Sequence, residues 1–206
     1  MIFRYSKELM KKFGNVIYNY FLSKFMYHQR RYYIRGHGEN RVDLSNFIKE
    51  SMSDDKIKIR SAWFKSMNEG QDGYDDIVID ILRWVWGNTD YVSDQESWGV
   101  PEYWQNARTT LDKKKGDCED GAILLLSLAR NAGVPENRIF LTCGYVDYNK
   151  GTSGHAYVTY RGDDGVNYIL DWCYFYDKRR IPNHKTVDDK RYWTPWWFGN
   201  DRGFYQ

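Results

Sequence analysis

Apolar residues recur every three or four positions in three parts of the chain, which is the spacing of an amphipathic or buried helix. Residues 6–27 show this spacing with lysines off the apolar face. Residues 75–88 show it up to a Gly-Asn pair that is typical of a helix end. The run over residues 118–129 is almost wholly apolar after its first turn, so it predicts a buried helix that stops at Gly133.

After residue 138 the pattern favours strands. Residues 138–146, 155–160 and 166–172 each predict a strand, and the Arg-Gly-Asp-Asp-Gly sequence of residues 161–165 predicts a turn between the last two. If this turn closes a hairpin centred on Asp163, residues whose numbers sum to 326 face each other across an antiparallel pair. A bulge would change that register.

The distribution of charge divides the chain into two parts. Residues 1–41 hold nine Lys or Arg and two Glu, whereas the whole chain has a net charge of only +2. We therefore predict a basic N-terminal helical arm or assembly segment over residues 1–73, with a short helix capped by Asp43, and a core over residues 74–206. A basic arm on an acidic body suits an acidic partner, nucleic acid or an anionic membrane surface.

Composition changes this picture in one respect, the aromatic content. Charged residues make up 28% and hydrophobic residues 42%, as in soluble globular proteins, but aromatic residues reach 18%. Large rings can fill a core, or they can anchor a partner at the surface. The tail over residues 173–206 is too aromatic to be disordered, so we expect it to wrap the core or to make a contact.

The number of cysteines indicates a reducing compartment rather than a disulfide framework. Cys118, Cys143 and Cys173 are few and odd in number, which fits free thiols in a reducing environment. No apolar stretch is long enough to span a membrane, and residues 1–7 lack the features of a signal peptide. The expectation is cytoplasmic synthesis without visible export.

Three residues carry the candidate chemistry. Cys118 opens a predicted helix, where the helix dipole and free N–H groups lower a thiol pKa and can receive an oxyanion. The residue numbers of His155 and Asp171 sum to 326, so these residues would face each other in the predicted hairpin. The carboxylate would then hold the imidazole across the strand pair. A thiol, a base and an orienting carboxylate form a nucleophile system that passes an acyl group to water or to an amine. The alternative for Cys118 is a buried structural cysteine.

The acidic residues beside the thiol work against it, because negative charge raises a thiol pKa. The sequence leaves open three explanations for the presence of Asp117, Glu119 and Asp120. The first is that they stabilise the positive end of a helix, the second that they pair with nearby cations, and the third that they hold a hard cation such as calcium. The cations within reach in the sequence are Arg108, Lys113, Lys114 and Lys115. The sequence contains no C-x-x-C or H-x-x-x-H pair, so it does not indicate a zinc site.

The order Gly-Asp-Cys-Glu-Asp-Gly-Ala, Gly-His-Ala and Leu-Asp over residues 75–175 resembles the transglutaminase-like superfamily of papain-type thiol enzymes. Within it, four motifs resemble the bacterial transglutaminase-like cysteine proteinases: Tyr91-Val-Ser-Asp94, Trp98-Gly99, Glu102-Tyr-Trp-Gln105 and Gly116-Asp-Cys-Glu-Asp120. Similar domains occur among bacteriophage proteins. The resemblance implies an α+β papain-like fold, with the nucleophile helix packed on an antiparallel sheet.

The resemblance also implies roles for residues. Cys118 would be the nucleophile, His155 the general base and acid, and Asp171 its orienter. Asp117 and Glu119 would bind calcium, and no other cofactor is required. An upstream side chain often completes the oxyanion site in this family, and the candidates for it are Trp104 and Gln105.

These features predict amide-bond chemistry on a protein substrate, as a cysteine peptidase or as a transglutaminase or deamidase. The proteinase branch is typically exported to the periplasm to cut surface adhesins, and the missing export signal departs from that. The competing prediction is an assembly protein, for example of a phage particle, that keeps the fold with a vestigial site and binds through residues 1–41 and the aromatic tail. Nucleic-acid binding through residues 4–41 is a weaker prediction, and it would fall steeply with salt.

Overall fold

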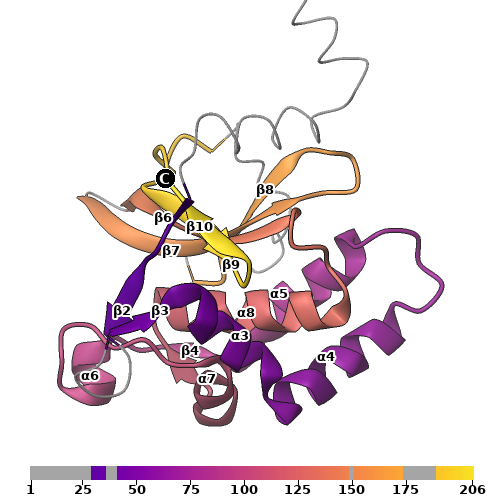
Figure 1. Ribbon diagram of the computed structural model, residues 1–206, viewed down its shortest axis with the longest axis horizontal. Helices are drawn as coiled ribbons and strands as arrows, with labels where there is room; N and C mark the ends of the chain where they lie inside the picture. Colours follow the sequence, from indigo (N-terminus) through magenta and orange to yellow (C-terminus); the bar gives the residue numbers. More distant parts are fainter. Residues whose placement is uncertain (1–28, 36–40, 149–150, 174–188) are drawn as a thin grey trace, which may run out of the picture.

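The computed structural model describes residues 29–35, 41–148, 151–173 and 189–206 (Figure 1). One antiparallel sheet of six strands lies across a layer of helices, and helix α8 lies directly beneath the sheet (Figure 1). The strand order is β1-β10-β9-β6-β7-β8. This α+β arrangement is the predicted one, in which the helix that Cys118 opens packs on an antiparallel sheet.

The helices of this layer are α3 (Leu44–Ser53), α4 (Asp55–Met67), α5 (Asp75–Asn88), α6 (Asp94–Trp98), α7 (Ala107–Lys113) and α8 (Cys118–Ala132). The large sheet contains β1 (Gln29–Arg30), β6 (Ile139–Tyr148), β7 (Gly151–Arg161), β8 (Asn167–Leu170), β9 (Trp197–Asn200) and β10 (Gly203–Tyr205). Two small sheets pair β2 (Tyr33–Arg35) with β3 (Arg41–Asp43), and β4 (Asp90–Tyr91) with β5 (Lys115–Gly116).

The predicted helix ends follow the local signals. Asp43 caps α3 by accepting a hydrogen bond from the N–H of Asn46 at 3.1 Å. Helix α8 ends at Gly133, which takes a φ of 110° that L side chains rarely adopt. The helix predicted over residues 6–27 lies outside the described residues.

Helix α8 is the centre of the hydrophobic core. It contacts α3, α4, α5 and α7 as well as β6 and β7, and nearly all of its residues are buried, as its apolar sequence predicts. Leu44 of α3 and Phe64 of α4 belong to the same core. The hydrophobic core therefore extends to residues before position 73, where the sequence suggested a boundary.

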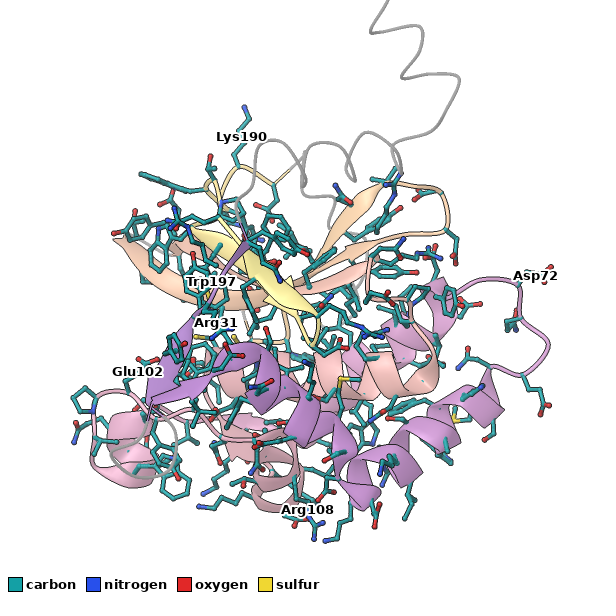
Figure 2. All side chains as sticks on the ribbon, in the orientation of Figure 1. Arg31, Asp72, Glu102, Arg108, Lys190 and Trp197 are labelled. Atoms are coloured by element: carbon teal, nitrogen blue, oxygen red, sulfur yellow. The ribbon has the colours of Figure 1, made fainter. Side chains whose placement is uncertain are left out.

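The aromatic tail contributes two strands to the sheet. Strand β9 pairs with β6, and β10 continues the sheet toward β1. Trp197 stands on this part of the sheet (Figure 2), where its ring lies 5.1 Å from that of Tyr32 and 5.2 Å from that of Phe204. Within the described residues, no helix has both the length and the apolar character needed to cross a bilayer.

The β7–β8 hairpin differs from its predicted register. Tyr160 pairs with Tyr168 and Val158 pairs with Leu170, so opposed numbers sum to 328 rather than 326. The turn is centred on Asp164, because Gly162 donates a hydrogen bond to the carbonyl of Val166 and Gly165 takes the left-handed conformation at φ 76°. The prediction that His155 directly opposes Asp171 is therefore wrong. The shift is two residues, which keeps both side chains on the same face of the sheet.

Gly121 of helix α8 lies close against Trp172, which follows β8. A methyl group on its Cα would overlap the indole of Trp172, which is buried and donates a hydrogen bond to the Cys118 carbonyl at 3.0 Å. Gly121→Ala is expected to lower the free energy of unfolding by about 3 kcal/mol through overpacking. Urea denaturation measures this. The matched control is Gly87→Ala on α5, where a methyl group meets nothing within 4 Å and should stabilise slightly. Equal effects of the two substitutions would contradict the expectation.

Candidate active site

Cys118 is the first residue of α8 and is half-buried. Its carbonyl is fixed by the indole of Trp172, and its Sγ lies 3.1 Å from Oε2 of Glu119. Burial raises the pKa of the Cys118 thiol well above its ordinary value, and the charges of Glu119 and Asp117 raise it further. The backbone N–H of Ala156, next to His155 on β7, acts in the opposite direction because it stabilises the thiolate. The helix start and β7 thus meet at this thiol.

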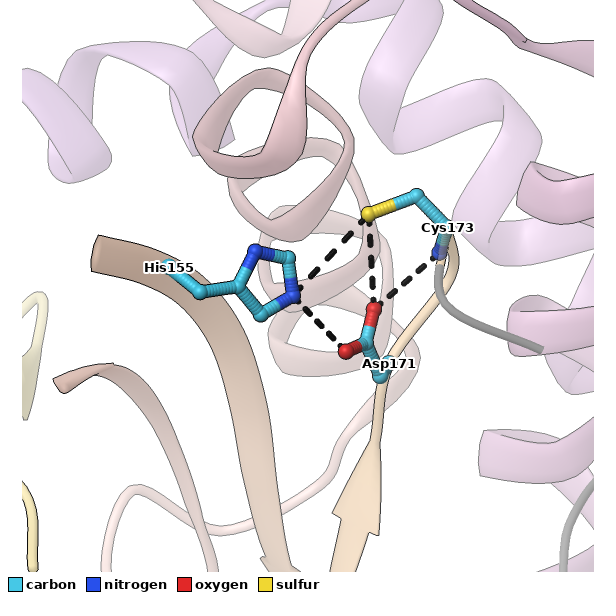
Figure 3. A group of neighbouring side chains, drawn as sticks. All are labelled: His155, Asp171 and Cys173. Carbon is cyan, nitrogen blue, oxygen red and sulfur yellow. Dashed lines mark hydrogen bonds and ion pairs between the residues drawn. The ribbon is translucent and has the colours of Figure 1, made fainter. Parts of the chain in front are cut away.

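His155 and Asp171 form a buried pair. Nε2 of His155 lies 2.7 Å from Oδ2 of Asp171, and both side chains are shielded from solvent (Figure 3). Burial by itself would raise the pKa of Asp171, but the His155 charge and the hydrogen bonds it accepts lower it overall. The carboxylate therefore holds the imidazole ring through Nε2, which fixes the orientation of the ring. The sequence predicted this pair even though its register was wrong, because a diagonal pair on one face remains within reach of a long side chain.

A third side chain joins the pair, and sequence analysis missed it. Cys173 donates its backbone N–H to Oδ1 of Asp171 at 3.1 Å, and its Sγ lies 3.4 Å from the same oxygen (Figure 3). The Sγ of Cys173 is also 4.0 Å from Nε2 of His155. The Leu-Asp-Trp-Cys order contained the signal, since residues 171 and 173 share a strand face when the chain stays extended.

Acidic side chains gather around the first turn of α8, beside Cys118. Carboxylate oxygens of Asp94, Asp117 and Asp120 lie within 4.8 Å of one another, as do those of Asp94, Glu102 and Glu119. Burial, followed by mutual repulsion, raises the pKa of Asp94 to about 6 and that of Asp120 to about 8. The pKa of Asp117 rises to about 7, again mainly through burial. We name these five residues the acidic cluster.

Two of the four cations that the sequence offered as partners of the acidic residues, Arg108 and Lys113, make other contacts. Arg108 pairs with Asp54 at 3.1 Å and with Asp112, on the side of the helical layer away from the sheet (Figure 2). Lys113 lies over the ring of Trp98, 3.5 Å from its centroid.

Two buried carboxylate oxygens of the acidic cluster, Oδ1 of Asp117 and Oε1 of Glu119, accept no hydrogen bond from any described residue. Carboxylate oxygens of these two residues lie within 4.8 Å of each other, and such oxygens are the ligands that a hard cation prefers. Asp117 and Glu119, the residues that the sequence indicated for calcium, thus fit that ion.

Comparison with known proteins agrees with the fold and the motif order. The family model of the bacterial transglutaminase-like cysteine proteinases matches residues 46–175. The chain belongs to this family. It is a transglutaminase-like cysteine peptidase, as the motifs predicted, and its substrates are proteins. Comparison with curated protein sequences gives no match.

Solved structures of LapG from Legionella pneumophila share the fold of this peptidase. The EGTA-treated form has a TM-score of 0.54 at 17% identity, covering 80% of this chain and 85% of LapG. The calcium-bound form has the same score and identity, with coverage of 80% and 87%. Nothing in these comparisons connects the peptidase to a bacteriophage, so the predicted phage origin and virion role have no support from them.

The two oxyanion candidates of the peptidase support the acidic cluster. Trp104 donates its indole N–H to Oε1 of Glu102 at 2.7 Å. Gln105 donates its backbone N–H to Oδ1 of Asp120 at 2.7 Å, and its side-chain amide to Oδ2 of Asp120 and to the carbonyl of Lys115. These contacts hold the residues 102–105 segment against the first turn of α8. The oxyanion role of Trp104 and Gln105 stays a prediction.

Tyr192 is a further residue that sequence analysis missed. Its hydroxyl donates a hydrogen bond to Oδ2 of Asp171 at 2.6 Å, and its ring packs on Tyr157 in a small buried cluster. Tyr192 lies in the tail, beyond the residues matched by the family model. The tail thereby supplies a hydrogen bond to the carboxylate that holds His155.

Tyr192→Phe removes that hydrogen bond and leaves the ring in place. We expect kcat to fall about fivefold with KM unchanged, the effect of about 1 kcal/mol of lost orientation. The control is Tyr168→Phe, which also removes a phenol-to-carboxylate hydrogen bond, at 2.7 Å to Asp164, but on the exposed hairpin. Steady-state kinetics distinguishes them, and equal losses in the two variants would refute a positioning role for Tyr192.

Proposed function

We propose that Cys118, His155 and Asp171 hydrolyse peptide bonds through an acyl-enzyme. The observation that carries the proposal is the buried pair of His155 and Asp171. The residue after His155 on β7, Ala156, donates its backbone N–H to the thiol at the start of α8. Nδ1 of His155 accepts the Cys118 proton, and the sulfur then attacks the substrate carbonyl carbon. The carbonyl electrons move to oxygen, where N–H groups at the helix start stabilise the charge.

Collapse of this intermediate breaks the C–N bond. His155 returns its proton to the leaving amine, so a new N-terminus is released and a thioester stays on Cys118. Water then gives a proton to His155 while its oxygen attacks the thioester. The C–S bond breaks, the thiolate regains its proton, and a new C-terminus leaves.

The acidic cluster is proposed to hold calcium. Asp117 and Glu119 offer the two unsatisfied oxygens, and Asp94, Glu102 and Asp120 complete an all-oxygen set of the kind that calcium prefers. A bound calcium ion would compensate the buried negative charge around the first turn of α8. LapG, the structural relative, has been solved in a calcium-bound form.

Calcium is expected to raise the melting temperature of the peptidase. A cation that binds only the folded state stabilises it by mass action, and about 100 times Kd of ligand corresponds to about 2.7 kcal/mol. The shift should be larger at pH 8 than at pH 5. The pKa of Asp94 is raised to about 6 and that of Asp120 to about 8, so at pH 5 protons occupy both carboxyls and compete with calcium. Differential scanning fluorimetry in calcium chloride, magnesium chloride and EGTA measures it. Asp117→Asn should remove most of the calcium shift, and a full shift in that variant would exclude the proposed site.

The reaction is tested by its products. Casein is incubated with the peptidase in calcium, with an iodoacetamide-treated sample as control, and the products are read by mass spectrometry. New casein N-termini that appear only with the untreated peptidase support hydrolysis. Added amine that becomes attached to glutamine side chains, or ammonia without new termini, would replace hydrolysis by transglutamination or deamidation.

A further inference from the structure

Cys173 places a second thiol against the histidine–aspartate pair. Its Sγ lies 4.0 Å from Nε2 of His155 and 3.4 Å from Oδ1 of Asp171 (Figure 3). Ligand atoms of the three residues lie within 4.8 Å of one another. The His155 and Asp171 side chains are fully shielded, while Cys173 is only partly buried. Hydrolysis as proposed above gives this thiol no role.

A thiolate, an imidazole nitrogen and a carboxylate oxygen are the three ligand types that zinc takes in proteins. Tetrahedral zinc with ordinary bond lengths separates a sulfur from a nitrogen or oxygen ligand by about 3.6 Å. The separations from the Cys173 sulfur, 4.0 and 3.4 Å, differ from that value by little. A nitrogen and an oxygen ligand of tetrahedral zinc lie about 3.4 Å apart. Zinc therefore replaces the 2.7 Å hydrogen bond between Nε2 of His155 and Oδ2 of Asp171, and these two side chains move apart to admit it. We propose that His155, Asp171 and Cys173 form an inhibitory zinc site, with water as the fourth ligand.

Zinc binding at this site rearranges two protons. The Cys173 sulfur loses its proton to solvent, since only the thiolate is a zinc ligand. Nε2 of His155 gives its lone pair to zinc, and the ring proton moves from Nε2 to Nδ1. An Nδ1 that carries a proton cannot accept another from Cys118. The inhibitory effect rests on the proposed function, but the binding of zinc does not.

This zinc site is chemically distinct from the acidic cluster. The cluster offers only carboxylate oxygens and suits a hard cation, whereas a thiolate and an imidazole favour zinc over calcium. Saturating calcium therefore leaves the zinc site available. Sequence spacing did not indicate it, because the ligands come from β7 and from the segment that follows β8.

Binding is tested with cobalt as a spectroscopic substitute for zinc, in saturating calcium and in the Cys118→Ala variant, so that the nucleophile cannot be a ligand. We expect one equivalent of cobalt to give a sulfur-to-metal charge-transfer band that zinc removes. The band should be lost in Cys118→Ala/Cys173→Ser and kept in Cys118→Ala/Cys143→Ser, which removes the buried thiol of β6. A band that survives without Cys173, or no band with all three ligands present, overturns the proposal.

A second measurement leaves Cys173 unmutated. Zinc should slow iodoacetamide labelling of Cys173 in Cys118→Ala at least tenfold, as read by peptide mass, and an unchanged labelling rate would overturn the proposal. Inhibition is then measured on casein, with each variant compared with its own zinc-free rate. Cys173→Ser should raise the half-inhibitory zinc concentration at least tenfold, and an equal concentration would place inhibition at Cys118 instead. If the native protein produces no new casein termini while cobalt still binds through Cys173 in Cys118→Ala, the proposed function is refuted and the zinc site stands.

Discussion

Cys118→Ala is expected to reduce kcat on a peptide substrate by about 10⁶-fold, close to the loss of all catalysis by the triad. Without the sulfur no acyl-enzyme forms, and His155 has no thiol proton to accept. The fold should persist, because alanine keeps the Cβ and the Cys118 carbonyl still accepts the hydrogen bond from Trp172. The measurement is kcat and KM on a peptide taken from a casein cleavage site.

The control for this prediction is the buried thiol of β6. Cys143→Ala removes the same atoms from the core, so its cost falls on stability rather than on kcat. Cys118→Ala should also keep the melting temperature and its calcium response. If it retains more than about 1% of native kcat, Cys118 is not the nucleophile, and another group must attack the substrate carbonyl.

Sequence patterns predicted the parts of the fold that depend on local chemistry. The apolar run after Cys118 predicted a helix buried on all sides, and α8 is such a helix. Asp43 and Gly133 were predicted to bound helices, because a capping carboxylate and a residue able to take positive φ act within one turn. Alternation predicted β7, where Ala156 and Val158 face the core with α8.

The register of the β7–β8 hairpin was not predictable from turn composition. Arg161-Gly162-Asp163-Asp164-Gly165 contains two glycines and two aspartates, and more than one centre satisfies it. Tertiary contacts decide between them. Asp163 accepts hydrogen bonds from the backbone of Tyr74 and Asp75 at 2.7 and 2.9 Å and pairs with Arg138, which fixes it in the loop.

The surroundings of the site depend on contacts distant in sequence. Tyr192 reaches Asp171 because the tail returns alongside β6, where Trp193 donates its N–H to the carbonyl of Tyr145. Asp94 and Glu102 belong to the acidic cluster. The backbone N–H of Tyr103 donates to Oδ2 of Asp94, and that of Gln105 donates to Oδ1 of Asp120, so this segment brings them together. No periodicity or spacing contains such information. Motif order suggested these segments only through the family resemblance.

Asp171→Asn is expected to lower kcat about 10⁴-fold with little change in KM, as a wrong tautomer does in a triad. Both oxygens of Asp171 accept hydrogen bonds, Oδ1 from the Cys173 backbone and Oδ2 from Tyr192 beside His155 Nε2. An amide NH₂ at Oδ1 would face a backbone N–H that cannot turn away. At Oδ2 it faces a hydroxyl that can rotate and a ring that can exchange its proton. The NH₂ group therefore takes the Oδ2 position.

In that orientation the asparagine donates to Nε2 of His155, so the ring proton moves to Nδ1. Nδ1 can then no longer take the Cys118 proton, and iodoacetamide labelling of Cys118 should slow along with kcat. The control is Asp147→Asn, an isosteric change at a carboxylate that binds Thr152 and Trp193 at the exposed end of β6, and it should keep kcat within about twofold. A kcat for Asp171→Asn within tenfold of native would mean that the carboxylate does not set the tautomer of His155. The inhibition proposed for zinc depends on the same proton position, so that result would remove its mechanism as well.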